Sequence, residues 1–228
     1  MTALECKKPG LGTGIYTCSD AAFLLQASSQ KIAQWARGYV RVVRGDKYMV
    51  PGVLPAAAGG TRLLTFADVI ELKYISYFRS CKVPIKEIRQ ASETLSQRFE
   101  TAYPFAQKRC MLAGTELIFE ENGKYLAAGN LQHILGIVNG FIDDIDFNDL
   151  EALRWWPMGR DVDIVVDPLK CYGAPTIKGH RLSTENIYRL YIAEEKNIES
   201  VTQWYDITVQ QAEDAVRFEE KWRDLKST

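Results

Sequence analysis

Two short helical patterns separated by a tight break constrain the fold of this chain more than any other feature. The first begins at Thr17, whose hydroxyl suits a helix cap, with Asp20 in the capping-box position three residues later. The second follows a cap at Ser28 or Ser29 and ends at Gly38, a residue typical of helix C-termini. Two short helices with a few residues between them have the spacing of a helix-turn-helix. The sequence therefore predicts this unit near its N-terminus.

The second helix has an apolar and a polar face. Ile32, Trp35 and Ala36 lie at the i, i+3, i+4 spacing of a buried stripe, so the polar residues between them point outward. A predicted hairpin follows over residues 39–64, with turn chemistry at Gly45-Asp46. Basic side chains on such a wing suit phosphate contacts, and those on the helix suit base edges. The candidate DNA-binding residues are Ser28, Ser29, Gln30, Lys31, Gln34, Arg37, Tyr39, Arg41, Arg44, Lys47 and Arg62.

The charge of the chain is divided in two. Residues 1–110 carry 16 Lys and Arg against 8 Asp and Glu, a net charge of +8, and the remaining residues carry 12 against 21, a net charge of −9. A basic half favours a polyanion, and an acidic half favours a different, basic partner. The alternative for the basic half is a helical domain whose lysines and arginines are simply solvated.

Two longer helices are predicted after the hairpin, one capped by Thr65 with Asp68 and one starting at Pro84. The order of elements over residues 14–98 resembles the MerR-like winged-helix family. The resemblance implies a homodimer, whose interface the apolar helices at 66–78 and 84–95 would supply unless they cover their own domain. Cysteines of MerR-type metal sensors have no match here, so metal or drug sensing is not implied. The matching residues are Tyr16-Thr17, Ala21-Ala22, Leu25, Ser28-Ser29, Ile32, Trp35, Leu64-Thr65-Phe66, Asp68-Val69, Leu72, Ile75 and residues 84–89.

The middle of the chain, residues 106–160, is predicted to connect two domains. A hairpin is expected at 111–128 and a short helix at 131–138. The adjacent Trp155 and Trp156 favour packing at a domain junction. The clustered acids Asp143, Asp144, Asp146 and Asp149 lie on one loop without the spacing of a calcium loop, so helix caps and a solvated surface explain them better than a metal site.

The acidic half has a second informative pattern. A short strand is predicted at 164–166 and is closed by a turn at Asp167-Pro168. Gly173, Pro175, Ile177, Gly179 and Arg181 follow. Three helix signals come next: one capped by Thr184, a short one over 198–205, and one capped by Thr208 with Gln211 in the capping-box position. This stretch, residues 162–224, resembles a small domain of VapB-like antitoxins, with His180 where that family has Thr. The resemblance implies a three-helix, helix-turn-helix-like bundle that binds a toxin. The candidate partner-binding residues are Gly173, Pro175, Lys178, Gly179 and Arg181; the alternative is a structural turn with Arg181 on an internal acid.

The predicted fold class is mainly α with small β-hairpins, in three parts: a winged-helix domain at 1–105, a connection at 106–160 and a helical domain at 161–228. The resemblances imply an antitoxin that neutralises a PIN-like ribonuclease toxin and represses its own operon. The alternative is a MerR-like regulator whose C-terminal half senses a small molecule. No catalytic motif appears, so we expect no enzyme and no cofactor or metal. Five dispersed cysteines and no apolar span favour a cytoplasmic protein without a membrane partner.

Overall fold

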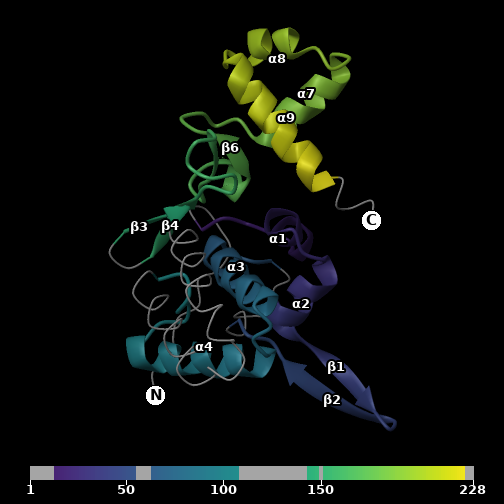
Figure 1. Cartoon of the computed structure of the whole chain (residues 1–228), viewed down its shortest axis with the longest axis vertical. Coiled ribbons are helices and arrows are strands. Elements are labelled where there is room, and N and C mark those ends of the chain that lie inside the picture. Colours follow the sequence, from purple (N-terminus) through teal and green to yellow (C-terminus); the bar gives the residue numbers. More distant parts are fainter. Residues whose placement is uncertain (1–12, 55–62, 108–142, 149–150, 224–228) are drawn as a thin grey trace.

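The computed structural model describes residues 13–54, 63–107, 143–148 and 151–223. Within these ranges the chain has seven α-helices and two small antiparallel sheets, so the predicted fold class, mainly α with small β elements, is confirmed. We call the described residues up to 107 the head and those from 143 onward the tail. Figure 1 shows the head at the bottom and the three helices of the tail at the top. The predicted hairpin at 111–128, the helix at 131–138 and Arg62 lie outside the described residues.

The helix-turn-helix is present as predicted. Helix α1, Cys18–Leu25, begins with a capping box in which the Thr17 side chain accepts from the Asp20 backbone and the Asp20 carboxylate accepts from the Thr17 backbone. Helix α2, Ser29–Arg37, has Ser28 as its N-cap and Gly38 as its C-cap. The turn between them is short because Gln26 adopts a left-handed conformation and ends α1 at once.

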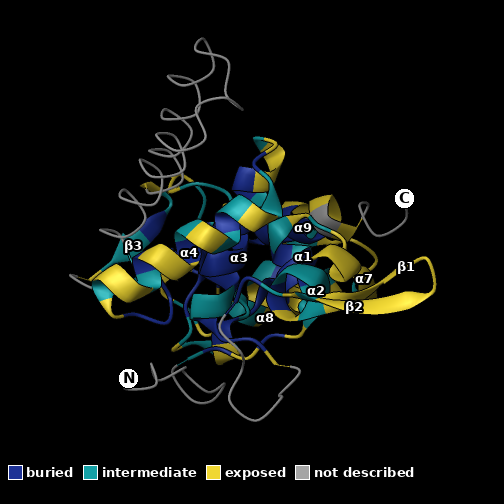
Figure 2. Cartoon of the chain, turned by 90° about the horizontal axis from the view of Figure 1, so that it is seen from below, coloured by how far each residue is buried: buried dark blue, intermediate teal, exposed yellow. Residues whose placement is uncertain are grey.

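The wing is a two-stranded ribbon of β1, Gly38–Val43, and β2, Asp46–Pro51. Its turn falls at Arg44-Gly45 rather than at the predicted Gly45-Asp46, because Val43 pairs with Asp46 and both loop residues have positive φ, as a type I′ turn requires. Nearly every residue of the ribbon is exposed, as the yellow strands of Figure 2 show. Arg89 of helix α4, Ile85–Phe99, anchors the base of the ribbon by donating hydrogen bonds to the Gly52 and Pro51 carbonyls at 3.1 and 2.6 Å.

Helix α3, Phe66–Ser80, is the centre of the head. It starts with the predicted Thr65–Asp68 capping box, and ten of its fifteen residues are buried within this one chain. Figure 2 shows it in dark blue behind α4, Ile85–Phe99, which buries only Ile88, Ser92 and Leu95. Each large apolar side chain buried in this way stabilises the fold by about 1.5–3 kcal/mol. Of the two roles open to the apolar helix at 66–78, covering its own domain is therefore the one observed.

A four-stranded antiparallel sheet opens the tail, in the order β3-β4-β5-β6. Its strands are β3, Ile145–Phe147, β4, Ala152–Trp155, β5, Ile164–Val166, and β6, Pro175–Ile177. Only β5 was expected; the aspartate cluster was predicted to be helix caps and solvated surface. Instead Asp146 lies in β3, where its carboxylate pairs with Arg160 at 2.8 Å and accepts from the Trp156 indole at 3.2 Å. Asp146 therefore helps to hold the edge of the sheet, while Asp149 lies outside the described residues.

The three predicted tail helices are α7, Thr184–Ala193, α8, Ile198–Tyr205, and α9, Val209–Arg223. Asn197 caps α8, and Thr208 with Gln211 forms the predicted capping box of α9. The cap of α7 is Ser183 rather than the predicted Thr184. Thr184 instead donates to the buried Glu219 carboxylate at 2.7 Å, which ties α7 to α9. In the part of the chain that the structure describes, no helix is long and apolar enough to cross a membrane.

Candidate nucleic-acid interface

Helix α2 exposes its polar face because its apolar residues anchor it to the head. Ile32 and Ala36 are buried and Trp35 is half-buried, which leaves Gln30, Lys31 and Arg37 exposed on the opposite side. The candidates Ser28 and Ser29 are also exposed, whereas Gln34 is half-buried. Their hydrogen-bonding and cationic groups are of the kind that contact base edges and phosphates.

Arg37 and Ser28 also have contacts within the head. The Arg37 guanidinium lies 3.2 Å from the Cys18 sulfur at the start of α1, so this contact joins the two helices at the end of the polar face of α2. The Ser28 hydroxyl accepts from the backbone N–H of Lys31 at 3.3 Å as the helix cap. These contacts orient the outer residues of α2 before any ligand binds.

The ribbon distributes its side chains over two faces according to the strand register. Tyr39 and Arg41 lie on the same face, and Arg41 pairs directly with Tyr48 across the strands. Arg44 lies at the tip, in the turn. Lys47 pairs with Val42 on the other face. The basic groups of the wing therefore extend from its base to its tip rather than along a single face.

The second face of the ribbon is largely apolar, a feature that was not predicted from the sequence. Val40, Val42 and Met49 are 53, 61 and 70% exposed. The signal was present in the sequence, because Val40 and Val42 lie two positions apart on either side of Arg41, which puts both on the face opposite to Arg41. A ribbon whose two faces are both exposed to solvent gains little stability from its own packing, so its position depends on its anchor to the head.

Two of the candidate partner-binding residues are placed at the contact between head and tail. The Tyr16 hydroxyl donates to the Gly173 carbonyl at 2.8 Å, and Gly173 is buried with a φ of +89°. A Cβ atom there would lie 2.0 Å from the Tyr16 hydroxyl oxygen, so the close approach requires glycine. Pro175 is half-buried in β6, paired with Val166.

The other three candidates form an exposed turn between β6 and α7. The Lys178 ammonium lies 3.9 Å from the Asp163 carboxylate and 5.4 Å from the centroid of the Trp156 ring. Arg181 is exposed, and no ion pair joins it to an acid among the residues that the structure describes. The predicted alternative, an internal acid bound to Arg181, is therefore not seen in that part of the chain.

Three further contacts join head and tail. The backbone N–H of Ile15 donates to the Tyr172 carbonyl at 2.8 Å, and the rings of Phe23 in α1 and Phe218 in α9 meet edge to face with centroids 5.9 Å apart. Lys73 of α3 lies over the ring of Trp155 in β4 at 5.4 Å. The predicted packing of the tryptophan pair at a junction is thus confirmed for Trp155.

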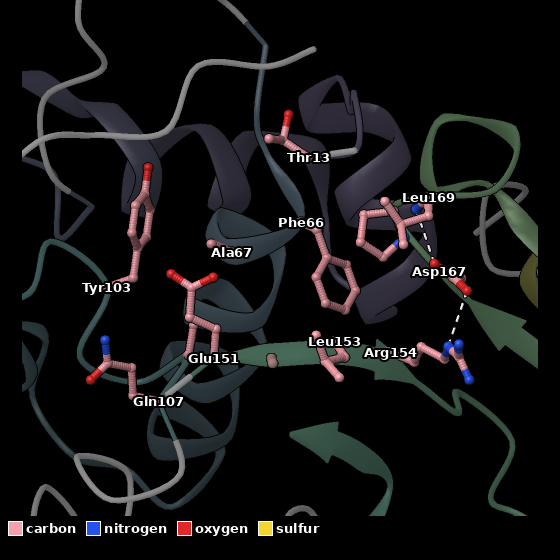
Figure 3. Close-up of a pocket in the computed structure, with 13 residues that line it drawn as sticks. Thr13, Phe66, Ala67, Tyr103, Gln107, Glu151, Leu153, Arg154, Asp167 and Leu169 are labelled. Atoms are coloured by element: carbon pink, nitrogen blue, oxygen red, sulfur yellow. Dashed lines mark hydrogen bonds and ion pairs between the residues drawn. The ribbon is translucent and has the colours of Figure 1, made fainter. Parts of the chain in front are cut away.

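Cavities lie along this junction. One of about 210 Å³ lies between α3, the loop at 103–107, β4 and the residues after β5, and Figure 3 shows Phe66 and Leu153 lining it beside the Arg154–Asp167 ion pair. Another, of about 370 Å³, lies between α1 and the tail. These cavities join segments far apart in the sequence, and no local pattern pointed to them.

Burial changes the ionisation of two neighbouring residues of α3. Desolvation lowers the pKa of Lys73 to about 7, although the nearby Asp144 carboxylate opposes the shift. Desolvation also raises the pKa of Glu71 well above its ordinary value, while its carboxylate accepts from the Ala106 backbone at 2.8 Å. No cluster of three or more histidine, cysteine or acidic side chains suited to a metal ion occurs in the described ranges.

Two family models match parts of this chain. Residues 14–92 match a family described as "Putative DNA-binding HTH domain", and residues 164–218 match one described as "Protein of unknown function (DUF433)". The two matches fall on the head and on the end of the tail. The helix-turn-helix found by the first match agrees with α1 and α2; its MerR-like assignment stays a prediction.

Two Mycobacterium tuberculosis proteins are similar to nearly the whole chain. "Uncharacterized protein Rv2308" is 24% identical over 92% of this chain and 91% of its own length. "Putative antitoxin VapB45" is 24% identical over 89% of this chain and 92% of its own length. The crystal structure of Rv2018 from the same organism superposes with a TM-score of 0.66 at 20% identity, covering 93% of this chain and 99% of that one, which shows a shared fold.

Proposed function

We propose that this protein is a DNA-binding antitoxin that represses its own operon and neutralises a PIN-like ribonuclease toxin encoded beside it. One observation carries the proposal: the polar face of α2 and the basic ribbon next to it are both exposed on the half of the chain with a net charge of +8. The match of residues 14–92 to a DNA-binding helix-turn-helix family and the similarity to a named antitoxin support it.

In this proposal the DNA-binding part comprises residues 1–105. Gln30, Lys31 and Arg37 contact the major groove, while Arg41, Arg44 and Lys47 contact phosphates along the backbone. Contacts by Ser28, Ser29, Gln34 and Tyr39 are proposed from their places in α2 and the ribbon, and a contact by Arg62, outside the described residues, is proposed from the sequence alone. Base contacts give sequence choice, whereas phosphate contacts give affinity that falls with salt.

Fluorescence anisotropy of DNA from upstream of the gene tests this part. We expect Arg37→Ala to weaken binding by at least ~10-fold, and Arg181→Ala, an exposed arginine of the tail, to leave it unchanged. Binding by the parent protein should weaken steeply as the salt concentration rises. Equal binding by the Arg37 and Arg181 variants would contradict the assignment of α2.

The tail, residues 161–228, is proposed to bind the toxin, with residues 106–160 as the connection. The exposed turn that carries Lys178, Gly179 and Arg181 is available for such a contact, whereas Gly173 has its contact inside the molecule. Co-expression with the neighbouring gene tests the proposal. A stable complex that suppresses ribonuclease activity is expected; the absence of a complex at micromolar concentrations would refute the antitoxin role.

A homodimer is part of the proposal, because two helix-turn-helix units reach two half-sites of an operator. Helix α3 is buried in its own head and leaves the interface to other surfaces. Sedimentation equilibrium would give the mass of the particle, and a monomer at micromolar concentration would contradict this element alone.

A second candidate is a regulator that responds to a small molecule. The cavity of about 370 Å³ between α1 and the tail favours it, because a ligand there would touch the DNA-binding unit and the tail together. A ligand that binds only the folded protein raises its melting temperature. A metabolite screen in which no compound raises it would exclude this candidate.

A further inference from the structure

The end of the tail farthest from the head combines negative charge with exposed apolar side chains. It consists of α8, the turn after it and the first turns of α9, at the top of Figure 1. We call Glu199, Trp204, Asp206, Val209 and Glu213 the distal face. All five are exposed, and Trp204 is 71% exposed.

The sequence around the distal face has one sign of charge. From Asn197 to Val216 the chain contains four acidic residues and no Lys or Arg. Three of the acids, Glu199, Asp206 and Glu213, are exposed. A surface of this kind repels nucleic acid and attracts a basic protein.

Trp204 is not needed for the packing of the tail. The bundle is held by Val201 of α8, which is fully buried, and by Ile187, Ala212 and Ala215 on the neighbouring helices. Val209 starts α9 just beyond the turn and is 50% exposed, so two apolar side chains flank Asp206. Exposed tryptophan within a charged rim is typical of the central residue of a protein interface.

The helix geometry of the tail also presents this face outward. Helices α8 and α9 are joined by the short turn 206–208, and Val209 and Gln210 at the start of α9 are exposed. The first turn of α9 contains no acid, but Asp206 in the turn before it and Glu213 in its second turn are both exposed, so this end of the tail suits a cationic protein surface.

We infer that the distal face binds the RNA-binding surface of the ribonuclease toxin, with its carboxylates in the place of RNA phosphates and Trp204 in the place of a stacked base. This inference rests on the proposed antitoxin function. A ribonuclease attracts a polyanion and therefore has a basic surface along its substrate path. Single-stranded RNA is held there by cationic side chains and by stacking on its bases. The distal face offers both chemistries, far enough from α2 for DNA and toxin to be bound at once.

Affinity for the purified toxin, measured with the full-length protein, tests the inference. Trp204→Ala is expected to weaken the complex by at least ~30-fold, as for a central interface residue. The double variant D206K/E213K is expected to weaken it by at least ~10-fold and to flatten its dependence on salt. Tyr172→Ala removes an aromatic ring that is 61% exposed elsewhere on the tail, and is expected to leave affinity unchanged. Excess single-stranded RNA should displace the wild-type protein.

The outcomes separate the two levels of the proposal. If the wild-type protein forms no complex with the toxin, the antitoxin function fails and the inference fails with it. If the wild-type complex forms and Trp204→Ala and D206K/E213K bind as tightly as Tyr172→Ala, the distal face is wrong and the antitoxin function stands. A loss confined to a K178A/R181A variant would assign the contact to the basic turn instead. All variants must keep wild-type DNA affinity and melting temperature, which shows that they fold.

Discussion

The contact between Tyr16 and Gly173 gives the sharpest test of how head and tail are joined. Replacing Gly173 by alanine places a methyl group 2.0 Å from the Tyr16 hydroxyl oxygen and 2.6 Å from the ring carbon that bears it. The residue also has a φ of +89°, which costs an L-amino acid about 1–2 kcal/mol. Overpacking adds about 1–3 kcal/mol, and the lost hydrogen bond adds about 1 kcal/mol. We expect a total loss of roughly 3–6 kcal/mol in the free energy of unfolding.

Gly179 is a matched control for this substitution. Its φ is +84°, and a Cβ atom there meets nothing within 4 Å. Gly179→Ala should therefore lose only the backbone cost of roughly 1–2 kcal/mol. Urea unfolding of the two variants, followed by circular dichroism, separates the steric cost from the backbone cost. Equal losses would refute the claim that Tyr16 requires glycine at position 173.

A double-mutant cycle with Tyr16→Phe adds an independent check. Phenylalanine removes the oxygen that the new methyl group meets most closely, but its ring stays near. The cost of Gly173→Ala should therefore shrink by roughly 1–2 kcal/mol in the Tyr16→Phe background. Additive costs would show that the two residues are not in contact.

Three further predictions concern other parts of the chain. Thr184→Val should lose about 1–3 kcal/mol of unfolding free energy, because the buried Glu219 loses a donor. The control Thr202→Val removes only an exposed hydrogen bond to the Glu199 carbonyl and should stay within about 0.5 kcal/mol; equal losses in denaturant melts would refute this. The pKa of Lys73 in the folded protein lies below its value in the unfolded chain, so the folded protein binds fewer protons between about pH 7 and 10.5. The free energy of unfolding should therefore rise with pH, by up to about 2 kcal/mol from pH 7 to 9. Lys73→Met should abolish this rise. Arg89→Ala removes two hydrogen bonds from the base of the wing and should weaken operator binding by up to ~10-fold in anisotropy titrations; undiminished affinity would show that the wing holds its place without this anchor.

Local chemistry explains why the helices of the head could be predicted. A capping box and an i, i+3, i+4 stripe involve residues within one or two turns of a helix. The pairs Thr17 with Asp20 and Thr65 with Asp68 therefore predict the starts of α1 and α3 without information from the rest of the chain. The same reasoning found the ends of α8 and the capping box of α9. The turn of the wing was displaced by one residue because the strand register, and not turn composition alone, decides which residues form the loop.

The sheet of the tail was mostly missed for a physical reason. Strands β3 and β4 have three and four residues, too few for an alternating pattern to stand out, and their stability comes from pairing with neighbours in the sheet. The prediction that Thr184 caps α7 was wrong for a similar reason, because the decision depends on a distant residue. Ser183 and Thr184 both suit a cap, and only the burial of Glu219 35 positions later decides which hydroxyl turns inward.

The sequence by itself determined the order of helices, their caps, the division of charge and the residues that α2 exposes, because each depends on neighbours along the chain. The tertiary structure alone decided that Gly173 meets Tyr16 across 157 positions, that Lys73 lies over Trp155, and that cavities lie where head and tail meet. It also decided that Trp204 remains on the surface while Val201 of the same helix is buried. Apolar side chains of one short helix look alike in sequence, and only the docking of α7 and α9 against α8 determines which of them leaves the solvent.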